Sequence, residues 1–130
     1  MSAAARTMVA FAAYMALTGA VLAAAPNVLL ALFGLPATDE PWIRILGLFM
    51  IIVSYYYYRA AASEATAFFH ATVHGRTVMA LFLAALGLTG ERVLILFGAA
   101  ELAGAVATAL ALRARPAPAL PPAELRRAVE

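Results

Sequence analysis

One carboxylate and one guanidinium stand inside long apolar stretches of this chain, Glu101 and Arg76. Counted from the polar turn at residues 89–92, Arg76 lies about 14 residues before it and Glu101 about 10 residues after it, so their depths differ by roughly 6 Å in two antiparallel helices. A lone charge at mid-span costs about 2.5–3.5 kcal/mol on insertion scales. We therefore expect an ion pair between Arg76 and Glu101. The alternative is a polar pocket in which Glu101 binds a ligand headgroup or relays a proton.

Two histidines form the second set of residues that could bind a metal ion or another ligand. His70 and His74 are four positions apart and share one helix face, with Arg76 nearly opposite. Two imidazoles at this spacing can hold one metal ion, but a third ligand is missing nearby, and one face cannot supply both axial ligands of a haem. We expect hydrogen bonds to tyrosine hydroxyls or lipid headgroups and predict no metal site. The alternatives are haem or a metal, and a quinone or other polar ligand.

Four consecutive tyrosines occupy positions 55–58. Tyrosine is enriched where lipid headgroups meet hydrocarbon, so a belt at the membrane surface is the first interpretation. The alternative is a ring-lined pocket for a flat or lipidic ligand near His70. In that case Tyr55 and Tyr58, with His70, His74 and Glu101, are the ligand-binding candidates.

The composition sets the class of protein. Of 130 residues, 65% are hydrophobic and 12% are charged, whereas soluble domains are about 45–50% apolar and about 25% charged. The partner that this composition requires is a lipid bilayer. The absence of cysteine excludes thiolate chemistry, and the scattered arginines form no nucleic-acid signature. The sequence contains no nucleophile elbow, P-loop, dinucleotide fingerprint or HExxH motif, so we predict no catalytic residue and no enzyme activity.

The elements that position these residues are apolar runs of about 20 residues, the length of a transmembrane helix. We predict an all-α fold, a four-helix transmembrane bundle, with a short extra interfacial helix after Pro26, where proline suits a helix start and Gly34 suits its end. Residues 1–113 form the membrane domain and 114–130 a Pro/Ala-rich cytoplasmic tail. The predicted spans are residues 7–25, 42–62, 66–88 and 93–112.

The orientation follows from arginine, which supplies all nine basic residues. Arg44 and Arg92 lie on one side, and six arginines lie on the other, which the positive-inside rule makes cytoplasmic. We therefore place both termini in the cytoplasm. The alanine-rich composition suggests a bacterial genome of high GC content, so we expect the bacterial inner membrane. Arg44 is expected to snorkel outward or to pair with Asp39 or Glu40. The six arginines are Arg6, Arg59, Arg113, Arg115, Arg126 and Arg127.

Small residues predict how the helices approach one another. Helices in lipid associate through close packing of small residues and a few polar contacts. The first span carries an alanine stripe at four-residue spacing, and one face of the fourth span is small and polar around Glu101. The predicted helix-packing residues are Ala12, Ala16, Ala20, Gly98, Ala105 and Thr108.

Several short segments together resemble the DoxX-like group of small bacterial four-span membrane proteins. They are Ala-Ala-Pro26 and Leu-Phe-Gly34-Leu-Pro36, then Arg44-Ile-Leu-Gly47, and most specifically Phe97-Gly98-Ala-Ala-Glu101-Leu-Ala-Gly104-Ala. The resemblance covers most of residues 8–112. It implies an association with membrane oxidoreductase complexes and quinone-linked electron transfer. The tyrosine run and the histidine pair have no counterpart in that pattern.

Three functions agree with these features. The first is a non-catalytic accessory subunit that packs against a larger membrane complex or against itself as a homo-oligomer. The second is a binder of a lipidic or redox ligand such as a quinone, haem or carotenoid, although no cofactor is required by any motif. The third is a transporter of a small solute or of protons, which would need oligomerisation because one four-span chain offers little pore.

Overall fold

The computed structural model describes residues 1–114, and all regular structure in this part of the chain is helical. Four of the helices are long and apolar enough to cross a membrane, which confirms the predicted fold class. The predicted tail begins at residue 114, and from residue 115 onward it lies outside the described residues. The helices are α1 (Ala3–Ala24), α2 (Pro26–Leu32), α3 (Trp42–Ala62), α4 (Thr66–Thr89) and α5 (Val93–Arg113).

The short helix α2 is present as predicted. Pro26 occupies its first turn, where the missing N–H of proline costs nothing. At its end Gly34 adopts φ 69°, a conformation that glycine accepts without steric cost. The N–H groups of Gly34 and Leu35 then donate to the carbonyls of Ala31 and Leu30, so a Schellman motif closes the helix.

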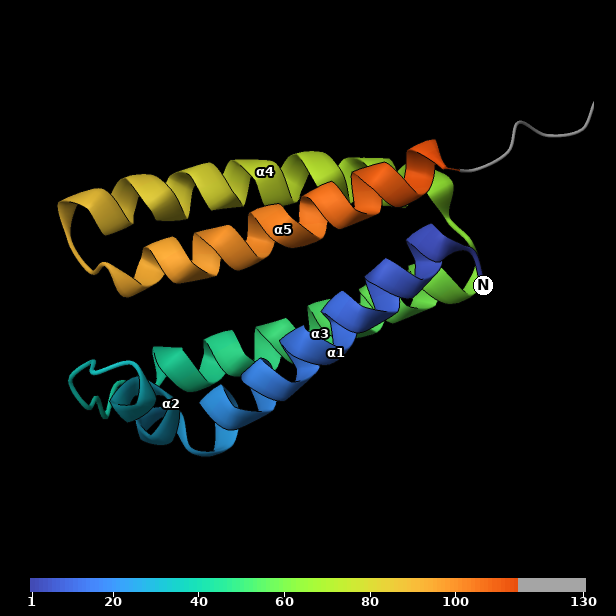
Figure 1. The fold of residues 1–130 in the computed structure, drawn as a ribbon. Helices are drawn as coiled ribbons and strands as arrows, with labels where there is room; N and C mark the ends of the chain where they lie inside the picture. Colours follow the sequence, from blue (N-terminus) through green and yellow to red (C-terminus); the bar gives the residue numbers. More distant parts are fainter. Residues whose placement is uncertain (115–130) are drawn as a thin grey trace, which may run out of the picture.

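The four long helices form two antiparallel pairs, α1 with α3 and α4 with α5 (Figure 1). In the first pair Gly19 and Gly47 allow a very close crossing, because a Cβ on Gly47 would lie 2.6 Å from the carbonyl oxygen of Gly19. In the second pair Gly98 faces the backbone of Ala80, whose carbonyl oxygen would lie 3.0 Å from an added Cβ. Glycine at each crossing brings the backbones close enough for van der Waals packing.

The two pairs join at the end of the molecule that holds the N-terminus. A buried apolar cluster there draws residues from α1, α3 and α4 together, and its members are Ala4, Ala5, Met8, Ala61 and Phe69. Next to it, the backbone N–H and the hydroxyl of Ser2 donate to the two carboxylate oxygens of Glu64, at 2.6 and 2.7 Å. This end of the bundle is therefore closed by both packing and hydrogen bonds.

Toward the opposite end the pairs diverge, so the molecule has the shape of a wedge (Figure 1). The helix α2 lies at this wide end, and its C-cap residue Phe33 contacts Phe97 of α5 edge to face, with ring centroids 5.0 Å apart. This aromatic contact links the two pairs where their long helices have separated.

Arg44 has a different role from the predicted ones. Its Nη1 donates to the carbonyl oxygens of Ala23 and Ala24, at 2.7 and 2.9 Å. These carbonyls end α1 and have no intrahelical partner, and a cation is favourable at that end of a helix. Arg44 thus caps α1 and fixes it to the start of α3, and among the described residues it forms no ion pair with Asp39 or Glu40.

Candidate functional site

A cavity of about 600 Å³ lies between the two helix pairs. All five helices contribute to its wall, which is almost entirely apolar. The charged members of the wall are Arg76 and Glu101, and they come from neighbouring positions of α4 and α5. A large apolar space with a few convergent polar groups is the usual form of a binding site for a small apolar molecule. Its wall includes Leu22, Leu30, Phe33, Trp42, Met50 and Met79.

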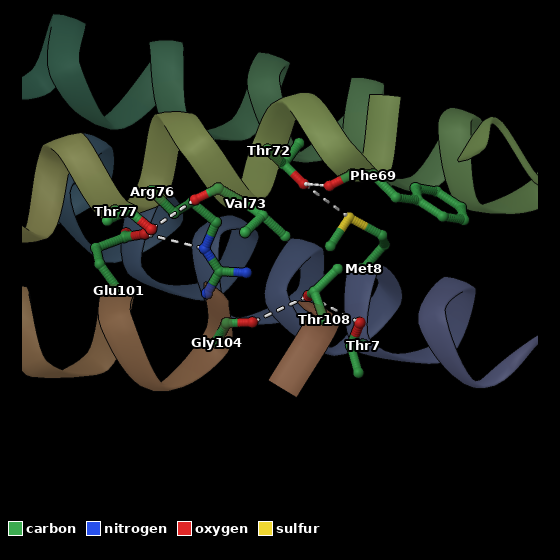
Figure 2. A network of polar contacts seen from close by, with 10 residues as sticks. All are labelled: Thr7, Met8, Phe69, Thr72, Val73, Arg76, Thr77, Glu101, Gly104 and Thr108. Atoms are coloured by element: carbon green, nitrogen blue, oxygen red, sulfur yellow. Dashed lines mark hydrogen bonds and ion pairs between the residues drawn. The ribbon is translucent and has the colours of Figure 1, made fainter. Parts of the chain in front are cut away.

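The structure brings Arg76 and Glu101 together, as their depths suggest. The Nε–H of Arg76 donates to Oε2 of Glu101 at 3.1 Å, and the two form an ion pair (Figure 2). The Arg76 side chain is 4% exposed and that of Glu101 is 19% exposed. Each charge therefore compensates the other in a place where water is scarce, as a charged group inside a membrane requires.

Two further contacts hold the guanidinium of Arg76 in place. Its central carbon lies 3.5 Å from the centre of the Phe11 ring, which is a cation–π contact with α1. On the opposing helix it lies directly against Gly104, where any side chain would overlap with Nη2. Among the described residues, Nη1 and Nη2 are buried and have no hydrogen-bond partner. Arg76 thus joins its own helix α4 to α1 and α5, and two of its donors remain without a partner among the described residues.

Hydroxyl groups continue the polar contacts toward the closed end of the bundle. The Thr108 hydroxyl donates to the carbonyl oxygen of Gly104 at 2.9 Å and lies 3.0 Å from the hydroxyl of Thr7. Figure 2 shows these threonines on the side of Arg76 that faces away from Glu101. The polar contacts therefore join α1, α4 and α5 between the apolar cluster and the cavity.

The tyrosine run divides between the cavity and the outer surface. Tyr57 lines the cavity, and its ring contacts Phe11 and Phe68 with centroid distances of 5.4 and 5.3 Å. Tyr55 and Tyr58 are exposed on the outer face of α3 and lie outside the cavity wall. Tyr57 is not among the residues that the sequence predicts for ligand binding, although it follows Met50 and Val53 at the seven- and four-residue spacing of one helix face.

The histidines lie elsewhere. His70 and His74 are exposed and line a separate groove on α4 and α5, next to Arg113. Among residues 1–114, no three His, Asp or Glu side chains gather in a way that could hold a metal ion. Glu101 and the histidines therefore belong to different places, and the predicted set of ligand-binding residues does not form one site.

The predicted helix-packing residues differ in how deeply they are buried. Gly98, Ala105 and Thr108 are buried on the inner face of α5, and Ala12 is buried on α1. Ala16 is half-buried, and Ala20 is exposed. The close approach on α1 occurs at Gly19, so a glycine rather than the predicted stripe of alanines makes the crossing.

The comparisons with known proteins find no match for this chain among family models, curated proteins or solved structures.

Proposed function

We propose that this chain is an integral membrane protein that binds a lipidic molecule in the cavity between its two helix pairs. The observation that carries this proposal is the cavity itself, an apolar space of about 600 Å³ with the Arg76–Glu101 pair in its wall. Long apolar walls suit an acyl or isoprenoid chain, and the ion pair offers hydrogen bonds to one polar end. The ligand-binding role, second among the functions that the sequence suggested, is the one that this geometry supports best.

The side chains that line the cavity distinguish among haem, a quinone and a carotenoid as ligands. The histidines lie outside the cavity wall, so a haem in this space would lack a histidine ligand, and we do not propose haem. A carotenoid requires apolar walls, and a quinone also requires hydrogen-bonding groups near its oxygens; the cavity supplies both kinds of lining. We propose a binding role without catalysis, because Arg76 holds Glu101 in an ion pair.

We further propose that the protein belongs to the DoxX-like group and acts as an accessory subunit that holds its lipidic ligand for a larger bacterial inner-membrane complex. The residues of the resembling segments support this, because Glu101 and Gly104 contact Arg76, and Gly98 packs against Ala80 of the same helix pair. Co-purification with a stoichiometric larger partner in mild detergent tests the subunit role, and a solitary monodisperse chain would contradict it.

The binding role is tested by purifying the protein in native lipid nanoparticles and identifying the extracted molecules by mass spectrometry. We expect one lipidic species to be enriched over the bulk membrane, in near-stoichiometric amount. Gly75→Phe is the informative variant, because Gly75 lines the cavity and an added Cβ would meet no atom within 4 Å. The added Cβ thus has open space at the cavity wall, and we expect the phenyl ring to occupy part of the cavity and abolish the enrichment.

Val78→Phe is the matched control. Val78 lies on the same helix, is largely exposed and is outside the cavity wall, so this variant adds the same ring to the outer surface. We expect it to retain the enriched species. Equal lipid profiles for the wild type and Gly75→Phe would overturn the binding proposal.

A further inference from the structure

The cavity is open to the side, between α3 and α4. These two helices follow one another in the chain, yet the close pairings are α1 with α3 and α4 with α5. Residues of the cavity wall on both helices are exposed at this position, with Phe49 at 62% and Met79 at 49%. In a membrane such side chains face the hydrocarbon of the lipid. A ligand can therefore pass between the bilayer and the cavity without entering water.

The polar groups of the cavity lie near the middle of the membrane. Arg76 is about 15 Å along α4 from its first residue, and Glu101 is about 12 Å along α5 from its first residue at a rise of about 1.5 Å per residue. The hydrocarbon core is about 30 Å thick. A zwitterionic phospholipid headgroup at this depth would lose its hydration at a large free-energy cost, so the polar end that reaches the pair must be small.

The charge balance of the ion pair also favours an uncharged ligand over an ionised one. Arg76 and Glu101 neutralise each other, so an ionised ligand would add an uncompensated charge in a medium of low dielectric constant. An uncharged oxygen adds none. It can accept a hydrogen bond from the guanidinium once the side chain turns toward the cavity, because Nη1 and Nη2 are buried against Gly104 and have no partner among the described residues.

We propose that the ligand is an uncharged lipid alcohol or ketone, which enters between α3 and α4 and places its oxygen at the Arg76–Glu101 pair. This inference rests on the proposed binding function and adds the chemical class of the ligand. The apolar body then extends from the pair along the wall toward Trp42 and α2, where the cavity residues carry only apolar or aromatic side chains, such as Leu30 and Leu46.

A matched pair of photoreactive probes tests the inference: octadecanol and octadecanoic acid, each carrying a diazirine at mid-chain. The full chain in phosphatidylcholine nanodiscs is irradiated with either probe at about pH 9, where the acid is ionised, and labelling is measured by intact mass. We expect the alcohol to label the wild type about tenfold more than the acid. Gly75→Phe should abolish alcohol labelling, and Val78→Phe should preserve it.

Glu101→Gln provides the second arm of the test. This change leaves the charge of Arg76 without its partner, so a carboxylate ligand can now replace the lost one. We expect the preference to reverse, with the acid labelling this variant more than the alcohol.

The labelling results separate three claims: that the cavity binds lipids, that the ligand is uncharged, and that the ion pair selects it. If the acid labels the wild type as strongly as the alcohol, and Gly75→Phe abolishes both, the cavity binds lipids but the uncharged class is wrong. If labelling by both probes is unaffected by Gly75→Phe, the proposed function itself fails. An unchanged preference in Glu101→Gln, in a variant that still purifies as a monodisperse species, would overturn the role of the ion pair in selection.

Discussion

The Arg76–Glu101 pair is the residue-scale feature on which both packing and binding depend. It joins α4 to α5, and the stacking of Arg76 on Phe11 adds α1. Removing one partner of a buried pair leaves an uncompensated charge, whereas removing both partners leaves none. The stability of the bundle should therefore respond to these residues in a strongly non-additive way.

We expect Glu101→Gln to lower the free energy of unfolding by about 3 kcal/mol, because Arg76 would remain charged and buried without a carboxylate. The double variant Arg76→Met with Glu101→Gln should recover a large part of this loss. Reversible unfolding in mixed micelles measures both values. Glu91→Gln is the control, since Glu91 is exposed in the turn before α5 and should change stability little. If the effects of Glu101→Gln and Arg76→Met on the free energy of unfolding simply add in the double variant, the two residues do not act as a coupled pair.

Gly104 should show its dependence on Arg76 in a second double-mutant cycle. An added methyl group at Gly104 overlaps with the guanidinium, so Gly104→Ala should destabilise the wild type by displacing Arg76. In an Arg76→Ala background the space is free, and the higher helix propensity of alanine should then stabilise the protein by up to about 1 kcal/mol. Unfolding measurements on the four proteins of the cycle test this reversal of sign. If Gly104→Ala changes the free energy of unfolding in the same direction with and without Arg76, this prediction is wrong.

The sequence predicts some of these residue positions and not others. The depths of Arg76 and Glu101 follow from counting along two antiparallel helices joined by a short turn, so the pairing is predictable. The rotation of a helix about its axis is harder to predict when nearly every face is apolar. For this reason the sequence does not distinguish Tyr57, the tyrosine on the cavity wall, from its exposed neighbours Tyr55 and Tyr58.

At the scale of helices, the crossing of Gly19 and Gly47 determines how α1 and α3 pack. An alanine stripe predicted a close approach along α1, and the approach occurs, but at a glycine. Alanine still carries a Cβ, and at this crossing a Cβ on Gly47 would lie 2.5 Å from the backbone nitrogen of Ala23. Backbone atoms cannot move aside as side chains do. The spacing of small residues thus predicts which helices pack closely, while the actual contact requires the smallest residue.

Gly47→Ala should therefore destabilise the protein by about 1–3 kcal/mol, the usual cost of overpacking. Gly75→Ala is the matched control, because the same methyl group meets no atom within 4 Å and alanine favours the helix. We expect this control to be neutral or slightly stabilising. Thermal unfolding monitored by circular dichroism distinguishes the two, and equal melting temperatures would contradict the close crossing of α1 and α3.

At the scale of the whole molecule, the wedge shape results from an unequal distribution of contacts. The buried cluster and the hydrogen bonds of Ser2 close one end, whereas at the other end the pairs are linked through α2 by the Phe33–Phe97 contact. Four apolar spans with short turns predict a bundle, and the bundle is present. They do not predict the divergence of the two pairs, because that depends on side-chain volumes at each end and on the short helix α2, which packs beside α1 at the wide end.

The orientation of the wedge in the membrane can be predicted from arginine. Arg6, Arg59 and Arg113 lie at the closed end, and Arg44 and Arg92 lie at the wide end. The positive-inside rule then places the closed end in the cytoplasm and the wide end, with α2, on the opposite side. The chain has no cysteine, so single cysteines report the side of the membrane without background.

Ala37→Cys, between α2 and α3, should react with a membrane-impermeant maleimide added outside spheroplasts of the expressing bacteria. Ser63→Cys, between α3 and α4, should react only after permeabilisation. Both positions are exposed, so accessibility of the side chain does not distinguish them. Val78→Cys, on the lipid-facing side of α4, should stay unlabelled in both conditions. The reverse pattern would mean that the wide end faces the cytoplasm, and α2 with its Phe33–Phe97 contact would then lie on the cytoplasmic side of the membrane.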